Sequence, residues 1–275
     1  MPFLPLRSVQ ISSNASELYS EWLAWLSDEL ESEECDRNEL CRRILTDIYF
    51  PHLADSDARP HPQVLRVALA QMNPQNVTLE PEYYQDIDLK RSTPRKPLLW
   101  LWEKFDRSHL GENVELGIRF RRILAHHVFG SCGANFKAFP HVRLSFGYNL
   151  NIGDNVVIHR HVLLDDRGGI EIGDGSSVSD FANVYSHFHD IVDGRIVETP
   201  KTVIGQGVRI TYHATILAGT HVADDSMVGA GAVLTKSTEP HCVYAGVPAK
   251  KVKKKPDQKQ SNKAPPTVDT LADEV

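Results

Sequence analysis

Six large aliphatic residues recur every six positions between residues 204 and 234, without a slip. A small or β-branched residue stands four positions after each of the first five. A six-residue period matches neither the 3.6-residue repeat of an α-helix nor the two-residue alternation of a strand. It fits short flat strands joined by tight corners, three to a triangular coil, whose stacking buries the aliphatic side chains in one column. The aliphatic set is Ile204, Ile210, Ile216, Val222, Val228 and Leu234, and the small set is Val208, Ala214, Thr220, Ser226 and Ala232.

The same rhythm begins earlier in the chain, where it is weaker and interrupted. The interruptions are FGYN at 146–149, DDRGG at 165–169, and a longer one between Val184 and Ile204. Loops that leave a regular repeat body tend to carry binding sites. We therefore expect coils over residues 129–252 and a functional site at one of these loops. The early aliphatic positions are Cys132, Ala138, Leu144, Ile152, Ile158, Leu164, Ile172, Val178 and Val184.

The region before the coils, residues 1–128, has the three- and four-residue apolar spacing that is typical of helices. We find no pattern of chemically reactive side chains in it. The segment after the coils, residues 253–275, is rich in Pro, Lys and Gln and predicts a disordered tail. The expected helices lie near residues 14–30, 37–49, 63–72, 97–108 and 114–128.

Composition excludes several classes of function. The formal net charge of −6 gives no overall attraction to nucleic acid or to an anionic membrane. The four cysteines lack the CxxC spacing of a zinc site or a redox motif. No basic segment leads an apolar run at the N-terminus, and the longest apolar run, 97–102, is too short to span a bilayer. We expect a cytoplasmic protein without nucleic acid or membrane partners.

The longest interruption opens with SHFHD, residues 186–190. His187 and His189 carry imidazoles, the side chains most often used as proton acceptors in catalysis, and Asp190 is a carboxylate that could orient one of them. A polar loop that binds nothing is the simpler alternative. A metal pair is a weaker one, because no Cys and no second pair of histidines supplies the remaining ligands, so we expect no metal.

Taken together, the hexads, SHFHD, FGYNLNIGDN, IGDG, VIGQGV, VGAGAVLTK and AGVPAKKV resemble the hexapeptide-repeat acyltransferases, and within them the galactoside and maltose O-acetyltransferases. The likeness covers residues 122–252. It implies a left-handed parallel β-helix, a homotrimer, and transfer of an acetyl group from acetyl-CoA to a hydroxyl. The expected fold is therefore mainly β, with an α-helical region before the coils.

The resemblance also implies roles for individual residues. The catalytic histidine of the family matches His189, or His187 if the loop is two residues shorter. The acceptor-binding asparagine of the family matches His159, and an aspartate matches Asp166, which could instead end a turn. The acetyl-CoA contacts match Tyr212, Ala230, Thr235, Lys236, Lys250 and Lys253, and the small side chain of Ala218 leaves room for the pantetheine arm.

These residues lead us to expect an acetyl-CoA-dependent O-acetyltransferase that acts on a sugar or a similar small hydroxyl compound. A histidine would act as general base and the acetyl group would transfer directly. A serine acetyltransferase ranks second, because residues 164–166 read Leu-Asp-Asp where those enzymes have a histidine, and their DRHP-like loop is missing. A non-catalytic trimeric scaffold is the third possibility.

Overall fold

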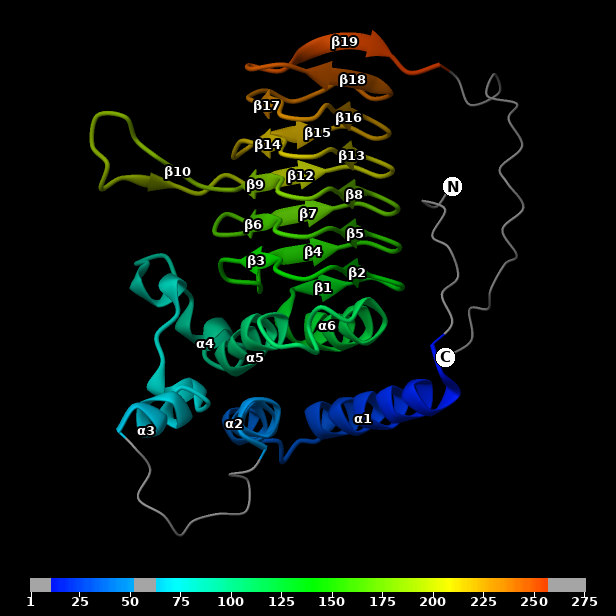
Figure 1. Cartoon of the computed structure of the whole chain (residues 1–275). Coiled ribbons are helices and arrows are strands. Elements are labelled where there is room, and N and C mark those ends of the chain that lie inside the picture. Colours follow the sequence, from blue (N-terminus) through cyan, green and yellow to red (C-terminus); the bar gives the residue numbers. More distant parts are fainter. Residues whose placement is uncertain (1–10, 52–62, 257–275) are drawn as a thin grey trace.

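The computed structural model describes residues 11–51 and 63–256. It consists of stacked triangular coils standing on a layer of helices (Figure 1). The expected mainly β chain with a preceding helical region is confirmed, and the coils form a left-handed parallel β-helix. No helix within the described ranges is long and apolar enough to cross a membrane.

The helical region begins with two capped helices whose first backbone N–H groups have side-chain partners. Ser12 accepts a hydrogen bond from the Ala15 N–H, and Asp36 accepts from Asn38 and Glu39. The helices are α1 (Ser13–Glu31), α2 (Arg37–Tyr49), α3 (Gln63–Ala70), α4 (Leu89–Ser92), α5 (Lys96–Asp106) and α6 (Val114–Val128), with short 3₁₀ turns η2 (Pro74–Asn76) and η3 (Glu80–Tyr83).

Three flat sheets form the faces of the coil stack. Equivalent residues lie one coil apart: Ile204 pairs with Val222, eighteen positions or three hexads later. The first sheet contains β1 (Ser131–Cys132), β4 (Leu150–Ile152), β7 (Ile170–Ile172), β12 (Thr202–Ile204) and β15 (His221–Val222). The second contains β2 (Lys137–Ala138), β5 (Val157–Ile158), β8 (Ser177–Val178), β13 (Arg209–Ile210), β16 (Met227–Val228), β18 (Cys242–Ala245) and β19 (Lys250–Lys254). The third contains β3 (Arg143–Leu144), β6 (Leu163–Asp165), β9 (Asn183–Tyr185), β14 (Thr215–Ile216) and β17 (Val233–Leu234).

The predicted aliphatic column is the core of the stack. Each of the six aliphatic residues at the hexad positions from Ile204 to Leu234 is at most 1 % exposed, and the small residues four positions later are also buried. Among the earlier positions, Cys132 and Leu144 in the first coil are only partly buried. Core residues of neighbouring coils lie side by side in the parallel strand pairs, as Cys132 beside Ile152 and Leu144 beside Leu164 show. Equivalent positions of successive coils therefore point toward the same core.

One corner of the stack carries a column of rings. His141, His161, Phe181 and His213 all adopt left-handed backbone angles, with φ between 56° and 66°. Neighbouring rings in the column stack with centroids 4.8 to 5.0 Å apart. Left-handed φ is uncommon for residues other than glycine, and here it recurs because each coil must turn the same tight corner.

The helical layer closes the open end of the coil stack, below β1 and β2 (Figure 1). The fully buried Arg121 of α6 fastens the two parts together. Its guanidinium pairs with Asp106 of α5 at 2.6 Å and donates to the carbonyl of Ala138 in β2 at 3.2 Å. Asp106 in turn accepts the backbone N–H of His141 at 2.7 Å. The helices therefore hold a fixed position relative to the first coil.

The interruption between Val184 and Ile204 leaves the stack as an arm (Figure 1). Its strands β10 (Phe188–His189) and β11 (Val197–Glu198) pair antiparallel. At the other end of the chain, β19 continues to Lys254, two residues into the segment expected to be a disordered tail, and pairs antiparallel with β18. The rest of that expected tail, 257–275, lies outside the described residues.

Candidate functional site

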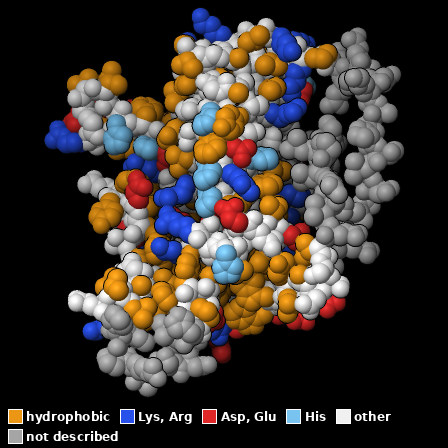
Figure 2. Space-filling view, in the orientation of Figure 1, with side chains coloured by type: hydrophobic (Ala, Val, Ile, Leu, Met, Phe, Trp, Pro, Cys, Tyr) orange, Lys and Arg blue, Asp and Glu red, His pale blue; other side chains and the backbone are white. Residues whose placement is uncertain are grey.

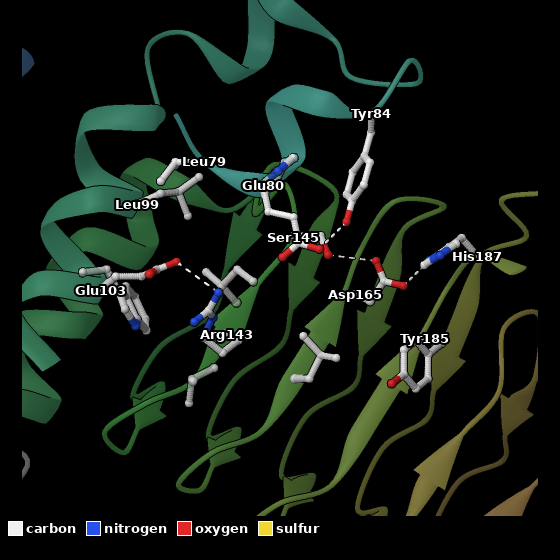
Figure 3. A pocket seen from close by; sticks show the side chains of 15 residues that line it. Leu79, Glu80, Tyr84, Leu99, Glu103, Arg143, Ser145, Asp165, Tyr185 and His187 are labelled. Carbon is white, nitrogen blue, oxygen red and sulfur yellow. Dashed lines mark hydrogen bonds and ion pairs between the residues drawn. The ribbon is translucent and has the colours of Figure 1, made fainter. Parts of the chain in front are cut away.

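A pocket of about 200 Å³ lies where the helical layer meets the third sheet (Figure 3). Its walls come from the 3₁₀ turn η3, from α5, and from the edges of β3, β6 and β9. The lining residues on the helical side are Leu79, Glu80, Pro81, Tyr84, Leu99, Trp102 and Glu103, and those on the coil side are Val142, Arg143, Leu144, Ser145, Leu163, Asp165, Tyr185 and His187.

An imidazole and a buried carboxylate meet on the coil wall of this pocket. The Nδ1 atom of His187 hydrogen-bonds to the Oδ2 atom of Asp165, whose side chain is 4 % exposed. The hydroxyl of Ser145 donates to Oδ1 of the same carboxylate at 2.8 Å. A carboxylate only accepts hydrogen bonds, so the proton lies on Nδ1 and the lone pair on Nε2. This tautomer is the one that can act as a base through Nε2.

His189 lies next to this pair, on the exposed arm. Its ring centroid is 5.7 Å from that of His187, and its Nδ1 donates to the Gly194 carbonyl at 2.7 Å. The Gly194 carbonyl, and not Asp190, therefore fixes the tautomer of His189. The Asp190 carboxylate instead accepts hydrogen bonds from the N–H groups of Val192 and Asp193. These hydrogen bonds lower the pKa of Asp190. His189 is not among the residues that line the pocket.

Asp166, which the sequence assigns to the acceptor, is fully buried. Its carboxylate accepts the backbone N–H of Phe146 at 2.7 Å and that of Asn149 at 3.1 Å, which fixes the FGYN turn. Burial raises its pKa to about 6, although these hydrogen bonds oppose the shift. Asp165, and not Asp166, faces the pocket. Acceptor binding by Asp166 stays a prediction.

His159 lies at a corner of the stack and does not line the pocket of its own protomer. Its ring stacks on Phe139 with centroids 4.9 Å apart, and its Nδ1 is 4.0 Å from a carboxylate oxygen of Asp180. Burial lowers the pKa of His159, although Asp180 opposes the shift. Its predicted contact with the acceptor also stays a prediction.

Sequence patterns do not predict the segment that closes the pocket on the helical side. We call residues 79–91 the strap. Arg167, in the second interruption, donates to both carboxylate oxygens of Asp86 in the strap, at 3.0 and 2.7 Å. The Arg167 guanidinium also lies 4.2 Å from the centroid of the Tyr84 ring. Residues 83–97 look irregular in sequence, and nothing local predicts that Asp86 has a partner 81 positions away.

Four of the residues expected to contact acetyl-CoA flank β14 and β17, the upper strands of the third sheet. The lower strands of that sheet, β3, β6 and β9, line the pocket. Tyr212 and Ala218 stand on either side of β14, and Ala230 and Thr235 stand on either side of β17. Tyr212 is half exposed, and Ala230 and Thr235 are exposed as well. The predicted contacts and the pocket therefore share one face of the stack.

The three predicted lysines lie at the upper end of the stack. Lys236 follows β17, and Lys250 and Lys253 are exposed on β19. None of the three forms an ion pair with a residue that the structure describes, whereas Lys251 and Lys255 pair with carboxylates at 2.6 and 2.8 Å. Lys and Arg side chains gather at this end (Figure 2). Within residues 11–51 and 63–256, no group of three or more His, Cys, Asp or Glu could hold a metal ion.

A scan against models of protein families finds no match. Among curated proteins, the chain is 29 % identical over 173 residues to the galactoside O-acetyltransferase of Escherichia coli, a match that covers 60 % of this chain and 82 % of the relative. It is 30 % identical over 137 residues to a putative lipopolysaccharide biosynthesis O-acetyltransferase of the same organism, covering 44 % of this chain and 70 % of the relative.

Comparison with solved structures also finds acetyltransferases. A maltose O-acetyltransferase from Clostridium difficile aligns with a TM-score of 0.55 and 27 % identity, over 64 % of this chain and 92 % of the other. A galactoside acetyltransferase in complex with coenzyme A has the same fold, with a TM-score of 0.55, 24 % identity, and coverage of 64 % and 88 %. With its six-residue repeats and coil stack, the chain belongs to the hexapeptide-repeat acyltransferases and is an acetyltransferase.

Proposed function

We propose that the protein transfers the acetyl group of acetyl-CoA to a hydroxyl of a sugar or a similar small molecule bound in the pocket. The observation that supports this most strongly is the His187 and Asp165 pair on the pocket wall. It combines a base whose lone pair is available with a buried carboxylate that orients it, beside a space large enough for a small acceptor.

In the proposed mechanism the acceptor hydroxyl attacks the thioester carbonyl while Nε2 of His187 takes its proton. A positioned general base typically contributes about 10²- to 10⁴-fold to such a step. The tetrahedral intermediate collapses, the C–S bond breaks, and the imidazolium returns the proton to the departing CoA thiolate. Asp165 holds the ring and stabilises the imidazolium that forms in between. No nucleophile from the protein is required.

Sequence position favours His189 as the base, whereas the geometry favours His187, which lines the pocket and has a carboxylate partner. We propose His187 as the base and keep His189 as the alternative. In either case the developing oxyanion needs a hydrogen-bond donor, and the backbone N–H near Tyr212 is the candidate from sequence.

Acetyl-CoA is proposed to bind along the upper part of the third sheet. The small side chains of Ala218 and Ala230 allow the pantetheine arm to approach the backbone. Lys236, Lys250 and Lys253 supply cations for the phosphates at the upper end. The structure solved with coenzyme A shares this fold. The three lysines form no ion pair with a described residue, which supports a role in binding phosphate.

We also propose that the chain works as a homotrimer, with each active site between neighbouring subunits. Ile191 and Val192 on the arm are 100 % and 91 % exposed, an unusual position for two adjacent large aliphatic side chains. A neighbouring subunit would cover them. Residues 129–252 would carry the transfer chemistry, and the helical residues 1–128 would supply one wall of the pocket.

The test is release of thiol from acetyl-CoA with a panel of sugars, amino sugars and serine, together with calorimetry for CoA binding and light scattering for subunit number. Release with a sugar or amino sugar, and acetylation at oxygen by mass spectrometry and NMR, would support the proposal. Release with serine alone would favour a serine acetyltransferase. No release and no CoA binding would favour the scaffold.

A further inference from the structure

The charged groups on the pocket wall pair among themselves and leave one carboxylate over. Arg143 lies 3.7 Å from Glu103, and His187 bonds to Asp165. Glu80 is different, because it forms no ion pair with any described residue. Its one side-chain hydrogen bond comes from the Tyr84 hydroxyl, which donates to Oε1 at 2.5 Å. Among the carboxylates that line the pocket, Glu80 is therefore the one with neither a cation nor an imidazole as partner among the described residues.

Glu80 is an exposed residue on the helical wall of the pocket, across from the imidazole and the carboxylate of the coil wall. Figure 3 shows Glu80 and Tyr84 reaching into the pocket from the helical side, while Asp165 and His187 come from the coil side. The strap that carries Glu80 is tied down by the Arg167 and Asp86 pair. Lys96 pairs with its Glu82 at 2.8 Å. These two ion pairs hold the strap on either side of the pocket, and the Tyr84 hydroxyl orients the Glu80 carboxylate.

The rest of the lining suits a cation. Aromatic side chains attract cations through their ring faces, and the Tyr84 ring already has the Arg167 guanidinium over it at 4.2 Å. The partly exposed Tyr185 also lines the pocket and offers a second ring. Three carboxylates line it against a single guanidinium, so a phosphate or carboxylate on the acceptor would meet net repulsion. A cavity of about 200 Å³ has room for an amino alcohol or one amino sugar ring.

We infer that the acceptor is a hydroxyl compound that also carries a positively charged amine, with the ammonium against Glu80 and the reacting hydroxyl at His187. This assigns an acceptor class to the transfer proposed above and rests on it. Acceptors with phosphate or carboxylate groups are excluded from the same space by charge.

Two probes of the same shape isolate the charge. Choline and 3,3-dimethylbutan-1-ol both carry a primary hydroxyl and differ only in a quaternary nitrogen in place of a carbon, and choline cannot be acetylated at nitrogen. Calorimetry with the full chain should show choline binding at least about tenfold more tightly than its neutral isostere. Glu80→Gln should remove this difference. Glu17→Gln, an exposed carboxylate on α1, should leave it unchanged.

The inference is overturned if the two probes bind equally, if choline does not bind in the millimolar range, or if its preference survives Glu80→Gln. Failure of the proposed transfer appears in a different measurement, as the absence of CoA binding in the same instrument. If CoA binds and acetyl groups are transferred to neutral hydroxyls without any charge preference, the acceptor assignment alone falls.

Discussion

Asp165 and His187 are 22 positions apart in the sequence and meet because β6 and β9 stack in register. Asp165 pairs across the sheet with Tyr185, so a side chain two residues beyond Tyr185 leaves the coil directly over the carboxylate. The backbone N–H of Ser186 donates to the Asp165 carbonyl at 3.0 Å and holds the start of the arm on the coil below. The repeat itself therefore builds the pair.

Asp165→Asn should lower kcat by about 10²- to 10⁴-fold, because an amide can no longer hold the proton on Nδ1 of His187 and stabilise the imidazolium. The KM for acetyl-CoA should stay within about twofold. Steady-state kinetics with the best acceptor measures both. Ser145→Ala is the matched control, since it removes the other hydrogen bond to Asp165 and should cost far less. Equal losses in the two variants would contradict the assigned role.

Asp86→Asn should raise the KM for the acceptor by about 10-fold or more, because the strap loses its bidentate pair with the nearly buried Arg167. Burial opposes ionisation of Asp86, but Arg167 outweighs it and lowers the pKa of this carboxyl. The pair therefore contributes fully above the ordinary pKa of 3.8 and is lost as pH falls through the lower folded-state value.

Glu39→Gln is the control for that variant, because Glu39 forms an exposed pair with Arg42 on α2, outside the pocket lining. Its acceptor KM should equal that of the unmodified chain. An unchanged acceptor KM in Asp86→Asn would mean that the strap has no part in acceptor binding.

The raised pKa of Asp166 predicts a distinct pH dependence of stability. The folded chain holds this proton up to about pH 6, whereas the unfolded chain releases it near 3.8. The contribution of Asp166 to the free energy of unfolding therefore falls by about 2 kcal/mol as pH rises from 4 to 6. Denaturation at fixed protein concentration should show that the free energy of unfolding of the unmodified chain falls relative to that of Asp166→Asn across this pH range. A constant difference between the two would refute the shift.

Replacing Lys250 and Lys253 together by Ala should raise the KM for acetyl-CoA more than that for acetyl-dephospho-CoA, because a phosphate contact is lost only for the former. Replacing Lys251 and Lys255, which already have carboxylate partners, is the matched control. The same rise in KM for both thioesters would mean that Lys250 and Lys253 contact only solvent.

Sequence reasoning predicts the coils well, because burial repeats along the chain with the six-residue period. Each of the six hexad aliphatic residues from Ile204 to Leu234 lies in the core. It also predicts the arm, since a broken repeat must leave the stack. It misses the strap. Tyr84, Asp86 and Arg167 meet through contacts between the helical layer and the coils, and no local period encodes contacts of that kind.

The choice between the two histidines shows the same limit. Counting positions from Val184 reaches His189, but which imidazole faces the pocket depends on where the arm bends away from the coil. Asp165 and Asp166 differ in a similar way: adjacent in sequence, one faces the pocket and the other holds the FGYN turn. Alternation along a strand is simple to predict, whereas its direction at the end of a strand is not.

The most direct test compares kcat for His187→Asn and His189→Asn with saturating acetyl-CoA and acceptor, after calorimetry has shown that both variants still bind CoA. If His187 is the base, its variant should lose at least about 100-fold in kcat, while the His189 variant retains most of its turnover. Loss of turnover in the His189 variant alone would contradict the account, because the base would then lie on the arm and not in the pair with Asp165.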